Sequence, residues 1–389
     1  MDIELNNLFI IGIIFFFGLA ADVLGRKTSI PRVTFLIITG IILGPSVLNI
    51  LPKHFVNNWF ETITIIALGM VGFLLGQQFT LKSLKDMGKT VFSIAIGKVL
   101  FAFLFISITL VFLFNIPFEV SLILASIATA TAPAAVYETV NELKIDNKFS
   151  KKLLAIVAFD DILALFLFSL VLAFVGFNNG SSDTNIIANG FYEIFGSIIL
   201  GFISGYPVAK ITGRLNGGEP LMVEALGSVF IMCGAAIMLG LSPILTTLAL
   251  GSSVATFASH HSTPFHAIKN IEWPFMILFF LLAGASLDIA ALLTLGSIGI
   301  VYIFMRILGI YIGAKIGAKI SNANKNIQNY IGLALIPQAG VAIGMALMAS
   351  HKFEQFSSII LPIVLGTTVF FEIIGPVATR YALKKTRKD

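Results

Sequence analysis

The sequence predicts an all-α polytopic membrane protein with about thirteen transmembrane helices, arranged as two inverted six-helix repeats with crossed discontinuous helices. The first observation behind this prediction is composition: the 389 residues are 57% hydrophobic and 12% charged, with a mean hydropathy of +0.97. The second is the recurrence of apolar runs of about 17–25 residues, the length that crosses a bilayer. The third is the concentration of lysine and arginine in alternate loops.

The apolar runs place the expected helices along the whole chain. The first run, from Leu8 to Ala21, follows no basic segment and precedes no small-residue cleavage site, so it is predicted to be a span rather than a signal peptide. The one cysteine, Cys233, lies inside an apolar run, which excludes a disulfide framework. The helices are expected at 7–24, 33–51, 59–80, 90–114, 118–141, 150–177, 190–211, 221–240, 243–258 (the shortest), 270–288, 292–320, 328–349 and 357–382.

The basic residues give the expected orientation. The 25 lysines and arginines fall in one set of alternate loops and in the tail, apart from Lys53, Lys352, Lys98 and Arg306. Under the positive-inside rule the N-terminus then lies outside and the C-terminus in the cytoplasm of a multi-pass protein of the plasma membrane. This distribution accounts for the net charge of +5 without a nucleic-acid partner. Lys98 and Arg306 differ from the rest because they lie inside predicted spans.

Two adjacent acids, Asp160 and Asp161, stand in the otherwise apolar stretch from 153 to 177. A charge at the bilayer centre costs at least ~2.5–3.5 kcal/mol, so an ionisable residue there is a functional candidate. The intramembrane cations Lys98 and Arg306 are natural partners for these carboxylates.

The polar features recur in the same order in two halves of the chain, on either side of the helix at 190–211. Each half has a cation, then a proline that must interrupt a helix, then an acid. Seven helices separate equivalent positions, so the halves have opposite orientations, as in many secondary transporters. The first half holds Lys98, Thr129, Thr131, Pro133, Asp160 and Asp161, and the second holds Arg306, Pro337, Gln338 and Glu372.

These residues suggest a mechanism of exchange. Carboxylates, a hydroxyl and carbonyls freed at the helix breaks are oxygen ligands, which suit a hard monovalent cation such as Na⁺, with K⁺ and Li⁺ as alternatives. A single site that accepts either the cation or a proton, and opens alternately to each side, couples the two movements. The carboxylates of Asp160 and Asp161 are the candidates for such a site, and no cofactor is expected.

Five segments resemble a known family in their order along the chain. They are Thr-Gly-Ile-Ile-Leu-Gly-Pro-Ser (39–46), Ala-Thr-Ala-Pro-Ala-Ala (130–135), Phe-Asp-Asp-Ile-Leu-Ala (159–164), Phe-Phe-Leu-Leu-Ala-Gly-Ala-Ser-Leu-Asp (279–288) and Arg-Ile-Leu-Gly (306–309). Together they resemble the monovalent cation:proton antiporter superfamily, in its second branch of Kef-like and Nap/Nha-type sodium:proton antiporters. Family members with an aspartate pair usually have a lysine at the position of Arg306. The arginine departs from that pattern and leaves the stoichiometry of cation and proton exchange open.

The resemblance implies a homodimer with a moving transport core. Its dimer domain would be 1–85 (helices one to three) and 219–290 (helices eight to ten), and its core 86–180 (helices four to six) and 291–383 (helices eleven to thirteen). The linker helix would lie in 181–218 and a cytoplasmic tail at 384–389. By the same resemblance Asp161 is the carrier, Asp160 is its neighbour paired with Arg306, and Thr131 lies at the helix crossing. Many Kef-like members also carry a nucleotide-binding regulatory domain, which is not expected in this chain.

Plainer interpretations exist for each residue. The aspartates, Lys98 and Arg306 could be purely structural; Lys98 could bond only the freed carbonyls; and Glu372 could stabilise a helix end before Gly375-Pro376. Thr129, Thr131 and Gln338 could satisfy local backbone. No Gly-x-x-x-x-Gly-Lys-Ser loop or catalytic metal spacing is present, so neither an ATP-driven pump nor an enzyme is predicted. Two other classes stay open, a cation channel and a Na⁺-coupled organic-anion symporter whose anion would bind the two cations.

Overall fold

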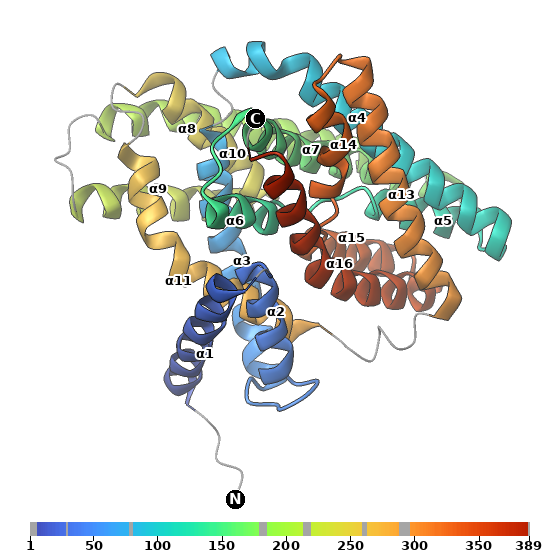
Figure 1. The fold of residues 1–389 in the computed structure, drawn as a ribbon, viewed down its shortest axis with the longest axis horizontal. Helices are drawn as coiled ribbons and strands as arrows, with labels where there is room; N and C mark the ends of the chain where they lie inside the picture. Colours follow the sequence, from blue (N-terminus) through green and yellow to red (C-terminus); the bar gives the residue numbers. More distant parts are fainter. Residues whose placement is uncertain are drawn as a thin grey trace, which may run out of the picture. The chain divides into compact units, whose positions relative to one another are not determined.

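The computed structural model describes residues 6–28, 30–77, 81–178, 185–212, 219–258, 263–287 and 296–387, which form helices and connecting turns without a β-strand (Figure 1). Within these residues, nine helices are long and apolar enough to cross a membrane. The predicted all-helical membrane protein is confirmed at that level. The nine spans lie in α1 (Asn7–Lys27), α3 (Lys53–Gly76), α4 (Leu81–Phe114), α7 (Lys148–Asn178), α8 (Asn185–Thr212), α9 (Glu219–Met238), α11 (Thr263–Ser286), α13 (Gly296–Ile320) and α16 (Ser357–Lys385).

Shorter elements complete the described chain. Four are apolar or contain an apolar stretch: α2 (Arg32–Leu43), α5 (Phe118–Ile127), α10 (Pro243–Phe257) and α15 (Gly340–Lys352). The others are α6 (Pro133–Leu143), α14 (Lys325–Ala334) and the 3₁₀ turn η1 (Glu354–Phe356).

The helix expected at 33–51 was predicted too long. Its counterpart α2 ends at Leu43, and Gly44 is extended with φ −72° and ψ 177°. The reason is Pro45, because the residue before a proline is disfavoured in the helical region and the proline has no N–H to donate. The chain then turns through Asn49, with φ 53°, before α3 begins.

The described chain forms two compact units. Unit 1 comprises Met1–Ser83 and Phe195–Leu287, and unit 2 comprises Leu84–Ile194 and Asp288–Asp389. The dimer and core roles expected for such segments stay predictions. The boundaries expected near 180, 218 and 290 lie outside the described residues.

A charge cluster around a buried aspartate joins three helices of unit 1. Asp22 on α1 is 4% exposed and accepts from Arg26 at 2.8 Å and from Arg32 at 2.9 Å. The Arg32 guanidinium also lies 4.2 Å from the ring centroid of Trp273 on α11. Pairing with two guanidiniums compensates the cost of burying the carboxylate.

In unit 2, α4 and α13 lie side by side (Figure 1), and glycines form their contact. A Cβ built on Gly97 would lie 2.5 Å from the carbonyl oxygen of Gly313, and one built on Gly309 would lie 2.8 Å from an α4 backbone carbon. Small residues let membrane helices pack backbone to backbone. This contact places Lys98, which follows Gly97, and Arg306, one turn before Gly309, in neighbouring helices.

Two helical paths of unit 2 are interrupted. The first breaks at 128–132, between α5 and α6, and the second at 335–339, between α14 and α15. The two breaks contact each other, because the Ala132 N–H donates to the Pro337 carbonyl at 2.9 Å. The last helix also packs there, since a Cβ on Gly375 of α16 would lie 2.6 Å from the Cα of Pro337.

The α4–α13 contact predicts a steric penalty for a larger residue. Gly313→Leu should destabilise the protein by about 1–3 kcal/mol because the leucine cannot fit against the α4 backbone. Thermal unfolding of the detergent-solubilised protein measures the loss. Gly234→Leu on α9 is the matched control, because a Cβ at Gly234 meets nothing within 4 Å. Equal stability of the two variants would contradict close packing at Gly313.

Candidate functional site

Lys98 lies fully buried on α4, and its ammonium binds three groups of the described break and of α7. It donates to the Thr129 carbonyl at 2.5 Å, to the Thr131 hydroxyl at 2.6 Å and to the carboxylate of Asp160. The last contact is an ion pair in which both side chains are 0% exposed. Since Thr129 and Thr131 belong to the first break and Asp160 to α7, one lysine connects three segments of unit 2.

The expected pairing of Asp160 with Arg306 is wrong in this structure, because the ion pair of Asp160 is with Lys98. Spacing along the chain placed both cations in the membrane but did not say which of them faces α7. The three-dimensional packing brings the α4 lysine to Asp160. The Arg306 nitrogens donate to backbone carbonyls instead.

Arg306 binds the backbone of both breaks. Its Nε donates to Ala128 O at 2.8 Å and one terminal nitrogen donates to Ala130 O at 2.8 Å, both in the first break. The other terminal nitrogen donates to Ile336 O of the second break at 2.7 Å. The guanidinium lies 4.2 Å from the ring centroid of Phe371 on α16, within the range of a cation–π contact. Its planar fork of donors suits three carbonyls at once.

The other predicted residues of the breaks also bond backbone. The Thr131 hydroxyl donates to Leu335 O of the second break at 3.3 Å, and Gln338 Nε2 donates to the last carbonyl of α5 at 3.0 Å. The Thr129 hydroxyl donates within its own turn at 2.7 Å. Pro133 is the first residue of α6, where its missing N–H costs nothing.

Tyr302 is a site residue that the sequence reasoning missed. It is 1% exposed on α13, and its hydroxyl donates to the Leu124 carbonyl of α5 at 3.2 Å. A tyrosine one turn before an intramembrane arginine was the available signal, because residues four apart share a helix face. Its hydroxyl extends the set of polar contacts from α13 to the first interrupted helix.

Three buried oxygens of the site have no hydrogen-bond partner among the described residues. They are Asp160 Oδ1, Gln338 Oε1 and Glu372 Oε2. Glu372 is 5% exposed on α16 and follows Phe371, the ring under the Arg306 guanidinium. Buried acceptors without donors are costly unless a proton, water or cation satisfies them.

Asp161 lies on α7 beside Asp160, and its side chain is outside the described part of the structure. No cluster of three or more His, Cys, Asp or Glu side chains resembling a metal centre occurs among the described residues. The described site therefore consists of one ion pair, an arginine that joins two breaks, and oxygen acceptors around them.

The helix ends of the site carry partial charges of both signs. At the breaks, α5 and α14 end in carbonyls that have no partner within the helix, which is the negative end of a helix dipole. Helices α6 and α15 begin there with N–H groups that have no partner within the helix, which is the positive end. Lys98 and Arg306 bind carbonyls at these breaks, and Asp160 offsets part of the added positive charge. Such a site can hold a small cation or a proton at carboxylate and amide oxygens.

Known proteins resemble this chain over almost all of its length. Residues 11–385 match the family model described as sodium/hydrogen exchanger, transmembrane. The probable Na(+)/H(+) antiporter GerT of Bacillus cereus is 26% identical over 84% of this chain and 86% of its own. The K(+)/H(+) antiporter subunit KhtU of Bacillus subtilis is 23% identical over 92% and 89%.

A solved structure shares the fold. The sodium proton antiporter MjNhaP1 from Methanocaldococcus jannaschii superposes with a TM-score of 0.72, covering 98% of this chain and 97% of its own. Its sequence is 19% identical, so this likeness concerns the fold alone.

The ion pair predicts unequal coupling in two double-mutant cycles. Lys98→Met should destabilise by about 3–5 kcal/mol, because it leaves the buried Asp160 carboxylate without its cation, and adding Asp160→Asn should recover part of the loss. The matched cycle combines Arg306→Met with Asp160→Asn and should show the smaller coupling. Unfolding in detergent measures both cycles. A larger coupling to Arg306 would restore the pairing expected from the sequence.

Proposed function

The chain belongs to the sodium/hydrogen exchanger family, and from this premise we propose that it is a secondary active transporter that exchanges a monovalent cation for protons. The observation that carries the proposal is the buried Lys98–Asp160 pair at the contact of two helix breaks. Interrupted helices that end inside the membrane are tolerated where they line a cavity or bind an ion. A purely structural crossing would not need an acid on α7 as well.

In this proposal Asp161 is the carrier, binding either the cation or a proton. Competition at one carboxylate enforces exchange, because the site must release one ion before it accepts the other. Asp160 acts on its neighbour through charge, and its pairing with Lys98 keeps that charge partly neutralised. Thr131 and the unpaired oxygen of Gln338 are further ligand candidates for the cation.

Arg306 has a different proposed role, which is to hold the two breaks together. Its three carbonyl bonds join the first break to the second. In this proposal they persist throughout the cycle. Arginine does not release its proton in proteins, so it is a fixed charge rather than a proton carrier. Glu372 contributes a second buried acid, whose ionised form would balance that charge.

Na⁺ is the proposed cation, with K⁺ and Li⁺ as alternatives. Oxygen ligands in a site enclosed by protein suit Na⁺, and the name of GerT supports this choice. KhtU is named as a subunit of a K(+)/H(+) antiporter, so related chains differ in the cation they select.

The wider architecture is proposed from the same family membership. Unit 2 contains the described site and is the proposed transport core, whereas unit 1 is the proposed dimer domain of a homodimer. Pairing α5 with α6 and α14 with α15 as interrupted spans would give the thirteen spans and the inverted repeats expected from the sequence. The proposed location is the plasma membrane, with the N-terminus outside.

Replacement of the carrier should abolish exchange. Asp161→Asn removes the group that would bind the cation and the proton, so a cation pulse should no longer move protons in proteoliposomes containing a pH-sensitive dye. Asp146→Asn is the matched control, because Asp146 is an aspartate of the same unit with an 80% exposed side chain, and it should keep full activity. Exchange retained by Asp161→Asn would overturn the mechanism.

The same proteoliposomes distinguish cations and coupling. Na⁺ should release the proton gradient at lower concentration than K⁺ or Li⁺, and no added organic solute should be needed. A change of 100 mV should alter the rate only if net charge moves, since each charge then gains ~2.3 kcal/mol. Cation current without proton movement would indicate a channel instead.

A further inference from the structure

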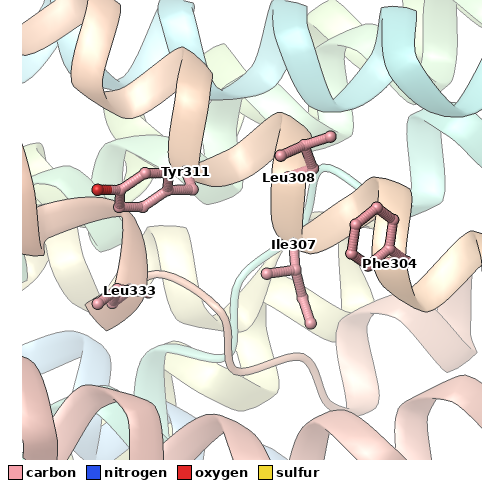
Figure 2. A pocket seen from close by; sticks show the side chains of 5 residues that line it. All are labelled: Phe304, Ile307, Leu308, Tyr311 and Leu333. Atoms are coloured by element: carbon pink, nitrogen blue, oxygen red, sulfur yellow. The ribbon is translucent and has the colours of Figure 1, made fainter.

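An apolar groove lies on unit 2 between α13 and α14. Figure 2 shows Phe304, Ile307, Leu308 and Tyr311 on α13, with Leu333 across from them on α14. The groove has a volume of about 330 Å³. Because α13 is a candidate membrane span and Phe304 is 60% exposed, this groove is open to lipid rather than to water.

The groove leads along one helix face to a positive charge. Residues 304, 308, 311 and 315 recur at the i, i+4, i+7 and i+11 spacing of a single face. The Lys315 ammonium lies 5.5 Å from the ring centroid of Tyr311, which lines the groove. Lys319 follows on the same face in the last turn of α13. Among the described residues, neither lysine forms an ion pair with a carboxylate.

The length of this face matches one leaflet of a membrane. From Phe304 to Lys315 is eleven residues, or about 16 Å at ~1.5 Å per residue. Half of the ~30 Å hydrocarbon thickness is a similar length. When Phe304 lies near the middle of the bilayer, Tyr311 and Lys315 therefore approach the headgroup level, where tyrosine and lysine side chains are stabilised.

We propose that the α13–α14 groove binds an anionic phospholipid, with an acyl chain against Phe304, Leu308 and Leu333 and the phosphate at Lys315 and Lys319. Apolar lining that ends in two ammonium groups, without a carboxylate partner in the part of the chain that the structure describes, is complementary to a lipid with net negative charge. A zwitterionic lipid offers the same chain but carries its own cation, so it competes poorly for the two lysines.

The position of Leu333 connects this lipid to the helix breaks. Leu333 is followed by Ala334, the last residue of α14, and then by Leu335 and Ile336, whose carbonyls bond Thr131 and Arg306. A chain in the groove thus contacts the half-helix that enters the second break. The binding itself does not depend on the proposed exchange activity.

Native mass spectrometry of the full-length protein in detergent tests the site, with dioleoyl-phosphatidylglycerol and dioleoyl-phosphatidylcholine added separately. Lys315→Gln should weaken phosphatidylglycerol binding about fivefold, because a lysine near a membrane surface contributes about 1 kcal/mol to anionic lipid binding. Leu333→Trp, which fills the groove, should reduce it as well. Lys315→Arg keeps the charge and should bind like the unmodified protein. Phosphatidylcholine binding should be unchanged by Lys315→Gln.

Lys210→Gln is the matched control. Lys210 makes the same lysine-over-tyrosine contact, 4.5 Å from the Tyr206 ring, on α8 of unit 1. Equal loss of phosphatidylglycerol in Lys210→Gln and Lys315→Gln would overturn the proposal, because it would indicate general surface charge. Undiminished binding to Leu333→Trp, or displacement of the lipid by millimolar inorganic phosphate alone, would also overturn it, since the groove would then not hold the chain. Thermal unfolding of each variant verifies that it is folded.

Discussion

The unit that carries the described site depends on one constraint, which is that backbone carbonyls inside a membrane must find donors within the protein. Two helical paths are interrupted there, and each interruption frees carbonyls that no helix can satisfy. Lys98 and Arg306 supply the donors, and together they bind Thr129, Ala128, Ala130 and Ile336. Removing either cation would leave buried polar groups unpaired, which is among the costliest changes a protein interior undergoes.

The two cations divide this task. Arg306 binds only backbone among its hydrogen-bond partners in the described residues, and it joins one break to the other. Lys98 binds the first break and also neutralises Asp160. The glycine contact between α4 and α13 makes this division geometrically feasible, since it brings the two helix backbones together beside the breaks. Arginine and lysine are therefore not interchangeable at these positions.

Helix α13 has two faces with different partners. One face carries Tyr302, Arg306, Gly309 and Gly313, which are buried against the interrupted helices and α4. The other carries the groove that we assign to an anionic lipid. The proposed lipid would thus contact α13, whose Arg306 binds the second break, and α14, which leads into that break through Leu335. A change in lipid composition would then affect the breaks through Leu333.

The sequence by itself determined the all-helical membrane class, because apolar length and charge distribution are properties of composition and order alone. Proline chemistry likewise marked Pro133 and Pro337 as points where a helix cannot run on. Tertiary structure decided the partner of Asp160, the backbone role of Arg306, the contact of Tyr302 and the groove beside Leu333. Each depends on which faces of separate helices meet, and spacing within one helix contains no information about the face that another helix presents to it.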